Sequence, residues 1–174
     1  MELESRLKAK IREVEDFPKP GISFKDITTL LKEGLAFQEA IDELAKRCER
    51  FSPQAVVAPE ARGFILGGAL AYRLGVGFVP VRKAGKLPAA TVSGSYQLEY
   101  GTDTLEMHAD AVIAGQRVLV FDDLLATGGT ICATIDLVKQ LGGEVVAAAF
   151  LIELTYLPGR EQLGDLPVVS IIRY

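Results

Sequence analysis

Residues 118–130 read VLVFDDLLATGGT, and this stretch decides the fold of the 174-residue chain. Four apolar residues, typical of a strand buried on both faces, run into two adjacent acids, Asp122 and Asp123. A loop of small residues follows, and apolar residues at helical spacing then predict a helix over 128–141. A buried strand that leads through a tight loop into a helix is typical of α/β proteins.

The loop after the two acids has the composition of an anion cradle. Ala126, Gly128 and Gly129 let backbone N–H groups approach a ligand closely, and Thr127 and Thr130 add hydroxyl donors. The N-terminus of the next helix adds the positive end of its dipole. We therefore predict that this loop holds a phosphate monoester, although it matches neither a Walker A loop nor a GxGxxG turn.

Asp122 and Asp123 lie at the end of the predicted strand, where a carboxylate is costly unless it has polar partners. Neighbouring side chains on a strand point to opposite faces, so the two acids make a poor acid–base pair. They suit a ligand with several hydroxyl groups, or the cation bound to such a ligand.

The rest of the chain predicts one domain over 1–174, built on a mostly parallel sheet with helices on both faces, because apolar runs without alternation are interleaved with helical patterns. Segment 82–103 differs: it carries basic residues, Gly and Pro and then alternates like a hairpin, as a flexible lid would. The expected strands are 54–58, 77–81, 117–121, 144–152 and 167–172, and the other expected helices are 3–14, 35–50 and 63–74.

Composition excludes several classes of protein. The 49% apolar and 24% charged residues are ordinary for a globular domain, and a net charge of −4 argues against a nucleic-acid partner. The charged start MELESRLKAK does not fit a secretory leader, and no uncharged run approaches the ~18 residues of a membrane span. With Cys48 and Cys132 expected to stay reduced, we predict a cytoplasmic protein without a membrane partner.

The form DDLLATGGT resembles the phosphoribosyl-pyrophosphate signature of the type I phosphoribosyltransferases, and in particular of the members that use adenine. Five further motifs fit that family's pattern in order: FPKPGISFKDIT at 17–28, APEARGF at 58–64, RKAGKLP at 82–88, LEYGTDTLE at 98–106 and ELTYLPGRE at 153–161. The resemblance implies the type I fold, with a small hood made of 1–30 and 150–174 and a flexible lid at 82–103. It also implies a pentosyl transfer from 5-phosphoribosyl 1-pyrophosphate to adenine, giving AMP and pyrophosphate in purine salvage.

The resemblance gives the acids and the phosphate loop partners in the sugar: Asp122 and Asp123 would bind the ribose, and the loop at 126–130 would bind the 5′-phosphate. The segment 58–64 follows a sheet strand, at the edge where open α/β sheets bind ligands, and Arg62 offers a bidentate fork for a diphosphate. In the family the peptide that corresponds to Glu60–Ala61 is often cis. The residues implied for the pyrophosphate are Glu60, Ala61, Arg62, Arg82, Lys83 and Lys86.

The base and its proton have implied partners as well. Phe24 is a natural stacking platform for a purine, and the resemblance places the edge of the base against main-chain atoms of Ser23 and Lys25. The resemblance adds Glu99 as the residue that handles the purine proton and Tyr100 as packing in the closed lid. Ala126 and Leu154 would form the apolar wall of the base pocket, and the catalytic set is Glu99, Arg62, Asp122 and Asp123.

The resemblance also implies Mg²⁺ that arrives with the substrate diphosphate, without a metal cage of the protein's own, and a homodimer in which Lys83 reaches the partner's pyrophosphate. Three alternatives stay open: transfer to hypoxanthine, guanine or xanthine; a nucleic-acid-binding regulator that senses the sugar diphosphate; and a ribose-phosphate pyrophosphokinase. A 6-oxopurine site would want a side-chain donor near the base. The regulator would need a basic face or an added helix-turn-helix, and the kinase has two tandem domains, for which this chain is too short.

Overall fold

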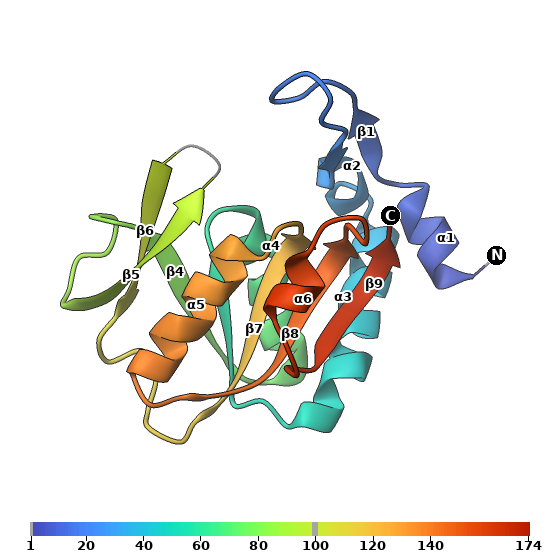
Figure 1. The fold of residues 1–174 in the computed structure, drawn as a ribbon. Coiled ribbons are helices and arrows are strands. Elements are labelled where there is room, and N and C mark those ends of the chain that lie inside the picture. The colour runs from blue at the N-terminus through green and yellow to red at the C-terminus, as the bar shows by residue number, and fades with distance from the viewer. Residues whose placement is uncertain (1, 99–100) are drawn as a thin grey trace.

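The computed structural model describes residues 2–98 and 101–174, in which a seven-stranded sheet has the order β5-β6-β4-β3-β7-β8-β9 (Figure 1). The strands β4, β3, β7, β8 and β9 run parallel, and the hairpin β5–β6 joins them antiparallel at β4. This mixed sheet flanked by helices confirms the predicted type I fold. The strand bounds are β3 Ala55–Pro59, β4 Gly77–Lys83, β5 Thr91–Leu98, β6 Gly101–His108, β7 Arg117–Leu125, β8 Glu144–Glu153 and β9 Val168–Arg173.

Helices cover both faces of the sheet. The helices α3 and α4 pack on one face, and α5 and the short α6 lie on the other (Figure 1). Along β7, Leu119 and Phe121 belong to the core under α3 and α4, whereas Val118 and Val120 belong to the core under α5. All four are fully buried, which explains the apolar run without alternation. The bounds are α3 Gly34–Cys48, α4 Arg62–Leu74, α5 Gly129–Gln140, α6 Gly159–Gln162 and a 3₁₀ turn, η1, at Glu49–Phe51.

The predicted helix over 3–14 is wrong beyond its first two turns. Helix α1 spans only Leu3–Lys8. Residues Arg12–Val14 form a strand, β1, that pairs antiparallel with β2 at Phe24–Asp26. Leu7 and Ile11 are still buried, so the apolar spacing reports the core contact and not the backbone conformation. This small sheet and the one-turn helix α2, Thr28–Leu31, stand above the carboxyl ends of β7, β8 and β9 (Figure 1).

Two other predicted bounds change. The strand expected over 117–121 continues to Leu125, because its ladder with β8 goes on through Asp122 opposite Phe150 and Leu125 opposite Glu153. The two acids therefore lie within β7 and not after it. The hairpin expected within 82–103 extends to His108.

The strand order sets the position of the site. Within the sheet, β3 lies between β4 and β7. The chain passes from β3 to β4 in one direction across the sheet, whereas β7 is followed by β8 and β9 in the other direction. The loops that follow β3 and β7 therefore begin side by side and open away from each other. In open α/β sheets such a reversal leaves a crevice at the carboxyl ends of the strands, where ligands bind.

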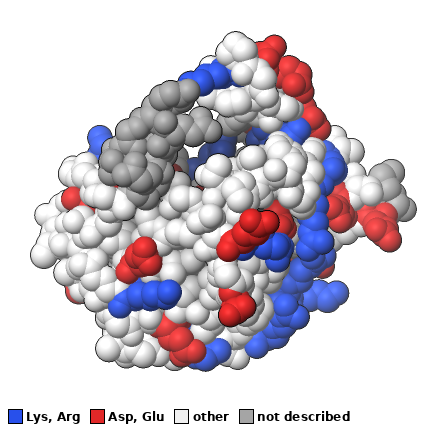
Figure 2. Space-filling view, viewed as in Figure 1, with Lys and Arg blue, Asp and Glu red and all other residues white. Residues whose placement is uncertain are grey.

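The outer edge of β9 is covered by cationic side chains. Lys and Arg gather along the side of the molecule where β9 and α3 lie (Figure 2). Arg47 of α3 donates a 3.0 Å hydrogen bond to the Ser170 carbonyl, which protects a free strand edge from pairing with another chain. In the described part of the chain, no helix has the length and apolar character to cross a membrane.

Candidate active site

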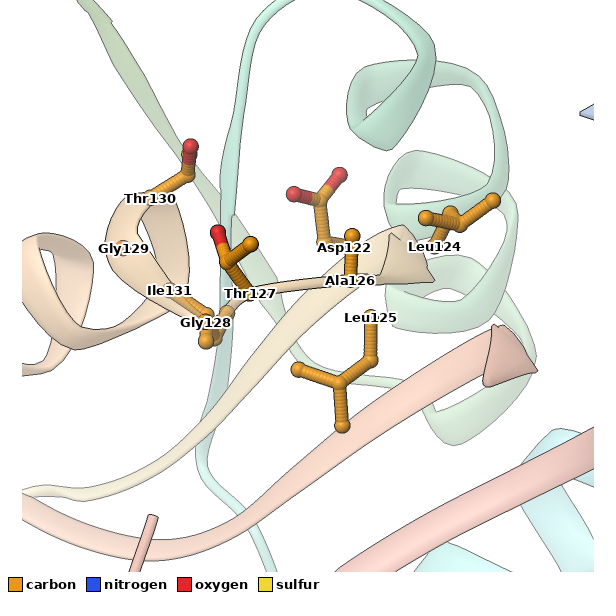
Figure 3. A pocket seen from close by; sticks show the side chains of 9 residues that line it. All are labelled: Asp122, Leu124, Leu125, Ala126, Thr127, Gly128, Gly129, Thr130 and Ile131. Atoms are coloured by element: carbon orange, nitrogen blue, oxygen red, sulfur yellow. The ribbon is translucent and has the colours of Figure 1, made fainter. Parts of the chain in front are cut away.

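The loop after β7 forms a small pocket that encloses about 80 Å³. Its lining consists of Asp122 and residues 124–131, so the predicted phosphate loop forms most of the wall. The Asp122 carboxylate and the hydroxyl groups of Thr127 and Thr130 point to the same side of the loop (Figure 3). Gly128, at φ +92°, turns the chain into α5, whose N-terminus opens on the pocket. The pocket thus combines hydroxyl donors with a helix N-terminus, as an anion site requires.

The far side of this loop rests on Gly159, the first residue of α6. A Cβ atom on Gly159 would lie 2.3 Å from the Ala126 carbonyl oxygen, and one on Gly128 would lie 3.2 Å from the Gly159 oxygen. Only glycine allows so close an approach of the two backbones. Sequence reasoning did not select Gly159, although it lies in the motif at 153–161, because nothing local shows which backbone it touches.

Asp122 and Asp123 are both held by the protein. Asp122 accepts a 2.8 Å hydrogen bond from the Asp123 backbone N–H, and its Oδ1 would lie 3.1 Å from a Cβ atom on Gly63. Asp123 is 5% exposed, and its carboxylate lies 2.7 Å from the Arg62 Nε. Burial, and next the Asp123 carboxylate, raise the pKa of Asp122 well above its ordinary value. The two acids and Arg62 therefore form one cluster of ionisable side chains, of which Asp122 lines the pocket.

This raised pKa predicts that Asp122→Asn stabilises the protein while it lowers turnover. Between the pKa of an unfolded Asp, about 3.9, and the raised folded value, the native state binds more protons than the unfolded one, so stability falls as pH rises. Asn does not ionise, so near pH 8 the variant avoids the cost of a buried negative charge. We expect it to melt at a higher temperature than wild type, by about 2–4 °C for each kcal/mol gained in the free energy of unfolding.

Melting curves at a series of pH values measure the effect. The advantage of Asp122→Asn should shrink as the pH approaches 4. If the variant melts above wild type by the same amount at every pH, or does not melt above it at any pH, the raised pKa of Asp122 is contradicted.

Arg62 connects the sheet with the N-terminal segment. It begins α4 directly after the Glu60–Ala61 peptide, which is cis, as the resemblance implied. Its guanidinium carbon lies 4.8 Å from the centre of the Phe24 ring, and its side chain is 38% exposed. The partly exposed guanidinium of Arg62 therefore contacts both Phe24 and Asp123.

The carboxylate of Glu60 faces the end of β4. It accepts a 2.7 Å hydrogen bond from the Lys83 backbone N–H and lies 3.4 Å from the Arg82 guanidinium. Burial opposes ionisation, but these hydrogen bonds and the charges of Arg82 and Lys86 lower the pKa of Glu60. The Lys83 ammonium lies 3.1 Å from the Asp103 carboxylate of the same chain. The expected pyrophosphate residues are therefore close neighbours at the carboxyl edge of β3 and β4.

The side chains around the expected base site are already engaged. The Ser23 hydroxyl donates a 2.7 Å hydrogen bond to Glu15, and the Lys25 ammonium lies 2.6 Å from Glu13. Lys25 is 6% exposed, and its ammonium lies 4.3 Å from the centre of the Tyr174 ring. Strand β2 pairs with β1 within the described chain, so its other edge offers main-chain N–H and C=O groups to a flat ligand.

The expected apolar wall lies where β7 and β8 end side by side. The Leu154 backbone N–H donates a 3.0 Å hydrogen bond to the Leu125 carbonyl, next to Ala126. Leu154 and Ala126 pack in the same apolar cluster. The last two predicted residues, Glu99 and Tyr100, lie outside the described residues.

Comparison with known proteins agrees with this geometry. A family model described as the phosphoribosyl transferase domain matches residues 28–165. An adenine phosphoribosyltransferase from Symbiobacterium thermophilum is 61% identical over 167 residues, 96% of this chain and 98% of the relative.

Solved structures extend the likeness to the fold. The crystal structure of adenine phosphoribosyltransferase from Thermoanaerobacter pseudethanolicus matches with a TM-score of 0.97 and 57% identity, over 99% of this chain and 100% of the other. The enzyme from Saccharomyces cerevisiae, in complex with adenine and an imino-altritol bisphosphate, matches with a TM-score of 0.93 and 39% identity, over 97% and 98% of the two chains. The chain therefore belongs to the adenine phosphoribosyltransferase family.

Proposed function

We propose that the protein transfers the 5-phosphoribosyl group from 5-phosphoribosyl 1-pyrophosphate to adenine and forms AMP and pyrophosphate in purine salvage. The observation that carries this proposal is the phosphate-sized pocket of residues 126–130 beside Asp122 and Asp123, at the point where the strand order reverses. The 61% identity to the adenine phosphoribosyltransferase from Symbiobacterium thermophilum supports this choice of reaction.

The sugar diphosphate would lie along this cluster. Its 5′-phosphate would take the N–H groups of the loop and the hydroxyls of Thr127 and Thr130, and its ribose hydroxyls would take the carboxylates of Asp122 and Asp123. Arg62 is 38% exposed and can turn its guanidinium to a diphosphate, for which it has the matching bidentate geometry. Ala61 and the basic residues Arg82, Lys83 and Lys86 would complete the pyrophosphate site.

The base would stack on Phe24. The Arg62 guanidinium now lies over this ring, and the base would take its place when Arg62 turns to the diphosphate. Because acids hold the side chains of Ser23 and Lys25, main-chain groups remain for recognition, which suits adenine better than a 6-oxopurine that wants a side-chain donor. The yeast relative, which forms a complex with adenine, supports this choice of base.

The reaction needs positioning and charge stabilisation more than covalent help. The bond from the sugar C1 to the diphosphate breaks ahead of formation of the bond to adenine N9, with oxocarbenium character at C1. The diphosphate leaves with the electron pair, and Arg62 would counter its charge. Mg²⁺ bound to the substrate diphosphate would supply further positive charge there. The N9 proton would pass to Glu99, and Tyr100 would pack in the closed lid; these two roles rest on the sequence.

The experiment supplies the sugar diphosphate and Mg²⁺ with adenine, hypoxanthine, guanine or xanthine in turn, and measures nucleotide by chromatography. We expect AMP from adenine and little nucleotide from the three oxopurines. Nucleotide from an oxopurine instead would favour the first alternative, and no nucleotide from any base would overturn the proposal.

We further propose a homodimer through a groove between α3 and α4. Phe37 and Ile41 of α3 and Ala69 and Tyr72 of α4 line this groove. Tyr72 is 89% exposed, and Leu35 beside the groove is 72% exposed, so large apolar side chains are open here, with Gln38 and the Asp42–Arg73 ion pair also in the lining. Such a patch marks an interface more often than a free surface, and the resemblance implies that the occupant is a second copy of the chain.

This interface predicts that Tyr72→Glu produces a monomer at concentrations where wild type is a dimer. A charge placed at the centre of an apolar interface has no partner there and loses its hydration. Analytical ultracentrifugation measures the change. Ile113→Glu, at a residue that is 73% exposed on a loop far from the groove, is the control and should stay dimeric. A dimeric Tyr72→Glu variant would place the interface elsewhere.

We also propose that the protein works in the cytoplasm. Cys48 and Cys132 are both free thiols, as is usual in a reducing compartment. Cys48 is buried, and burial raises its pKa to about 12, so it stays a thiol at neutral pH.

A further inference from the structure

Glu153 is a buried acid at the carboxyl end of β8, outside every role described above. It is 3% exposed, and its two oxygens lie 2.6 and 2.7 Å from Nε and Nη2 of Arg160 in a bidentate pair. The Ser170 hydroxyl donates to the same carboxylate, and Arg173 lies 3.6 Å away. The hydrogen bonds from Arg160 chiefly lower the pKa of Glu153, so the acid is charged in the folded protein.

One partner of Glu153, Arg160, lies next to the residue on which the loop at 126–130 rests. Arg160 follows Gly159, whose Cα approaches the Ala126 carbonyl so closely that a Cβ would lie 2.3 Å from it. On the other side, Leu154 follows Glu153 and donates its backbone N–H to Leu125, just before the loop. Helix α6 lies over the sheet on the same side as α5 (Figure 1). The ion pair thus joins the end of β8 to the one helix on which the loop rests.

A purely stabilising role does not account for an ionic pair at this place. An apolar pair of similar volume often stabilises a protein as well or better, because burying a charge is costly. A bidentate arginine–carboxylate pair adds a defined orientation, which an apolar contact lacks. Here the pair fixes the orientation of α6. It thereby fixes the position of the loop at 126–130, which rests on Gly159.

We propose that Glu153 and Arg160 are positioning residues for the 5′-phosphate: their pair holds α6 so that Gly159 supports the loop at 126–130 in its binding conformation. This inference rests on the proposed function, since it assigns the loop to a phosphate. Neither residue contacts the ligand itself. The pair should therefore affect affinity for the phosphate and leave affinity for the base and ribose nearly unchanged.

The experiment measures the binding of AMP and of adenosine by calorimetry, and the ratio of the two affinities reports the contribution of the phosphate. Arg160→Gln is the test variant, because the Arg160 side chain is 44% exposed and because Ser170 and Arg173 still contact the Glu153 carboxylate after the change. We expect the ratio to fall about tenfold, as for loss of a hydrogen bond to a charged group. Arg160→Lys keeps the charge without the fork, and its ratio should lie between those of wild type and Arg160→Gln.

Glu144→Gln is the matched control. Glu144 begins the same strand that Glu153 ends, and it lies 3.3 Å from Arg117 at the edge of the sheet away from the site. Its ratio should equal that of wild type.

The outcomes separate the two proposals. If wild type binds AMP no better than adenosine, the phosphate pocket and the proposed function fail. If wild type prefers AMP and Arg160→Gln keeps the same ratio, or loses affinity for both ligands equally, the positioning role is wrong. Should Arg160→Gln not fold, Arg160→Lys carries the test, and an unchanged ratio in that variant overturns the proposal.

Discussion

Asp123→Asn should lower kcat by about two to three orders of magnitude, the usual effect of removing one preorganised electrostatic group from a site. The carboxylate lies 2.7 Å from Arg62 and within β7, so it can both hold the ribose and orient the guanidinium. Asn has nearly the same shape as Asp, but it carries no charge and has one acceptor oxygen where the carboxylate has two. The sugar would then lose an anchor in the transition state, when its C1 becomes cationic.

The protein should stay folded, because Arg62 is 38% exposed and remains hydrated after the change. Steady-state kinetics and a melting curve measure the two effects separately. Asp136→Asn, on the exposed side of α5, is the control and should keep wild-type kcat. A kcat for Asp123→Asn close to that of wild type would remove Asp123 from the mechanism.

Gly159→Ala should raise the KM for the sugar diphosphate by about 10², since each hydrogen bond lost to a charged group such as the 5′-phosphate costs about 1.5–3 kcal/mol. The added Cβ would lie 2.3 Å from the Ala126 oxygen and 2.8 Å from a Leu125 methyl group, so the loop or α6 has to move. The loop is the part that opens on the pocket, and its N–H groups would no longer converge on one phosphate.

Gly77→Ala is the matched control, because a Cβ atom there meets nothing within 4 Å and the residue begins β4, at the edge of the sheet away from the site. Its KM should not change. A wild-type KM for Gly159→Ala would show that the loop does not depend on its contact with α6.

The parts of the fold that could be predicted from sequence are those that local pattern determines. Val118 and Val120 face one core and Leu119 and Phe121 the other, so an uninterrupted apolar run was a sufficient sign of a central parallel strand. The loop at 126–130 and the helix after it were predictable for the same reason, since the small residues and the helical pattern lie in one continuous stretch.

The parts that could not be predicted depend on contacts between distant residues. Residues 12–14 continue a helical apolar pattern, yet they form a strand because Phe24–Asp26 supplies a partner. The pairing of Arg62 with Asp123 joins residues 61 positions apart along the chain, and no local spacing indicates it. Gly159 likewise looks like an ordinary turn residue until the fold brings Ala126 against it.

The most direct test of the account is to incubate the protein with 5-phosphoribosyl 1-pyrophosphate, Mg²⁺ and adenine, and to follow AMP and pyrophosphate together by phosphorus NMR. Transfer at C1 predicts that the two products appear in equal amounts, at the rate at which the sugar diphosphate disappears, and that neither forms when adenine is left out. Loss of the sugar diphosphate to ribose 5-phosphate and pyrophosphate without AMP, or no reaction at all, would contradict it.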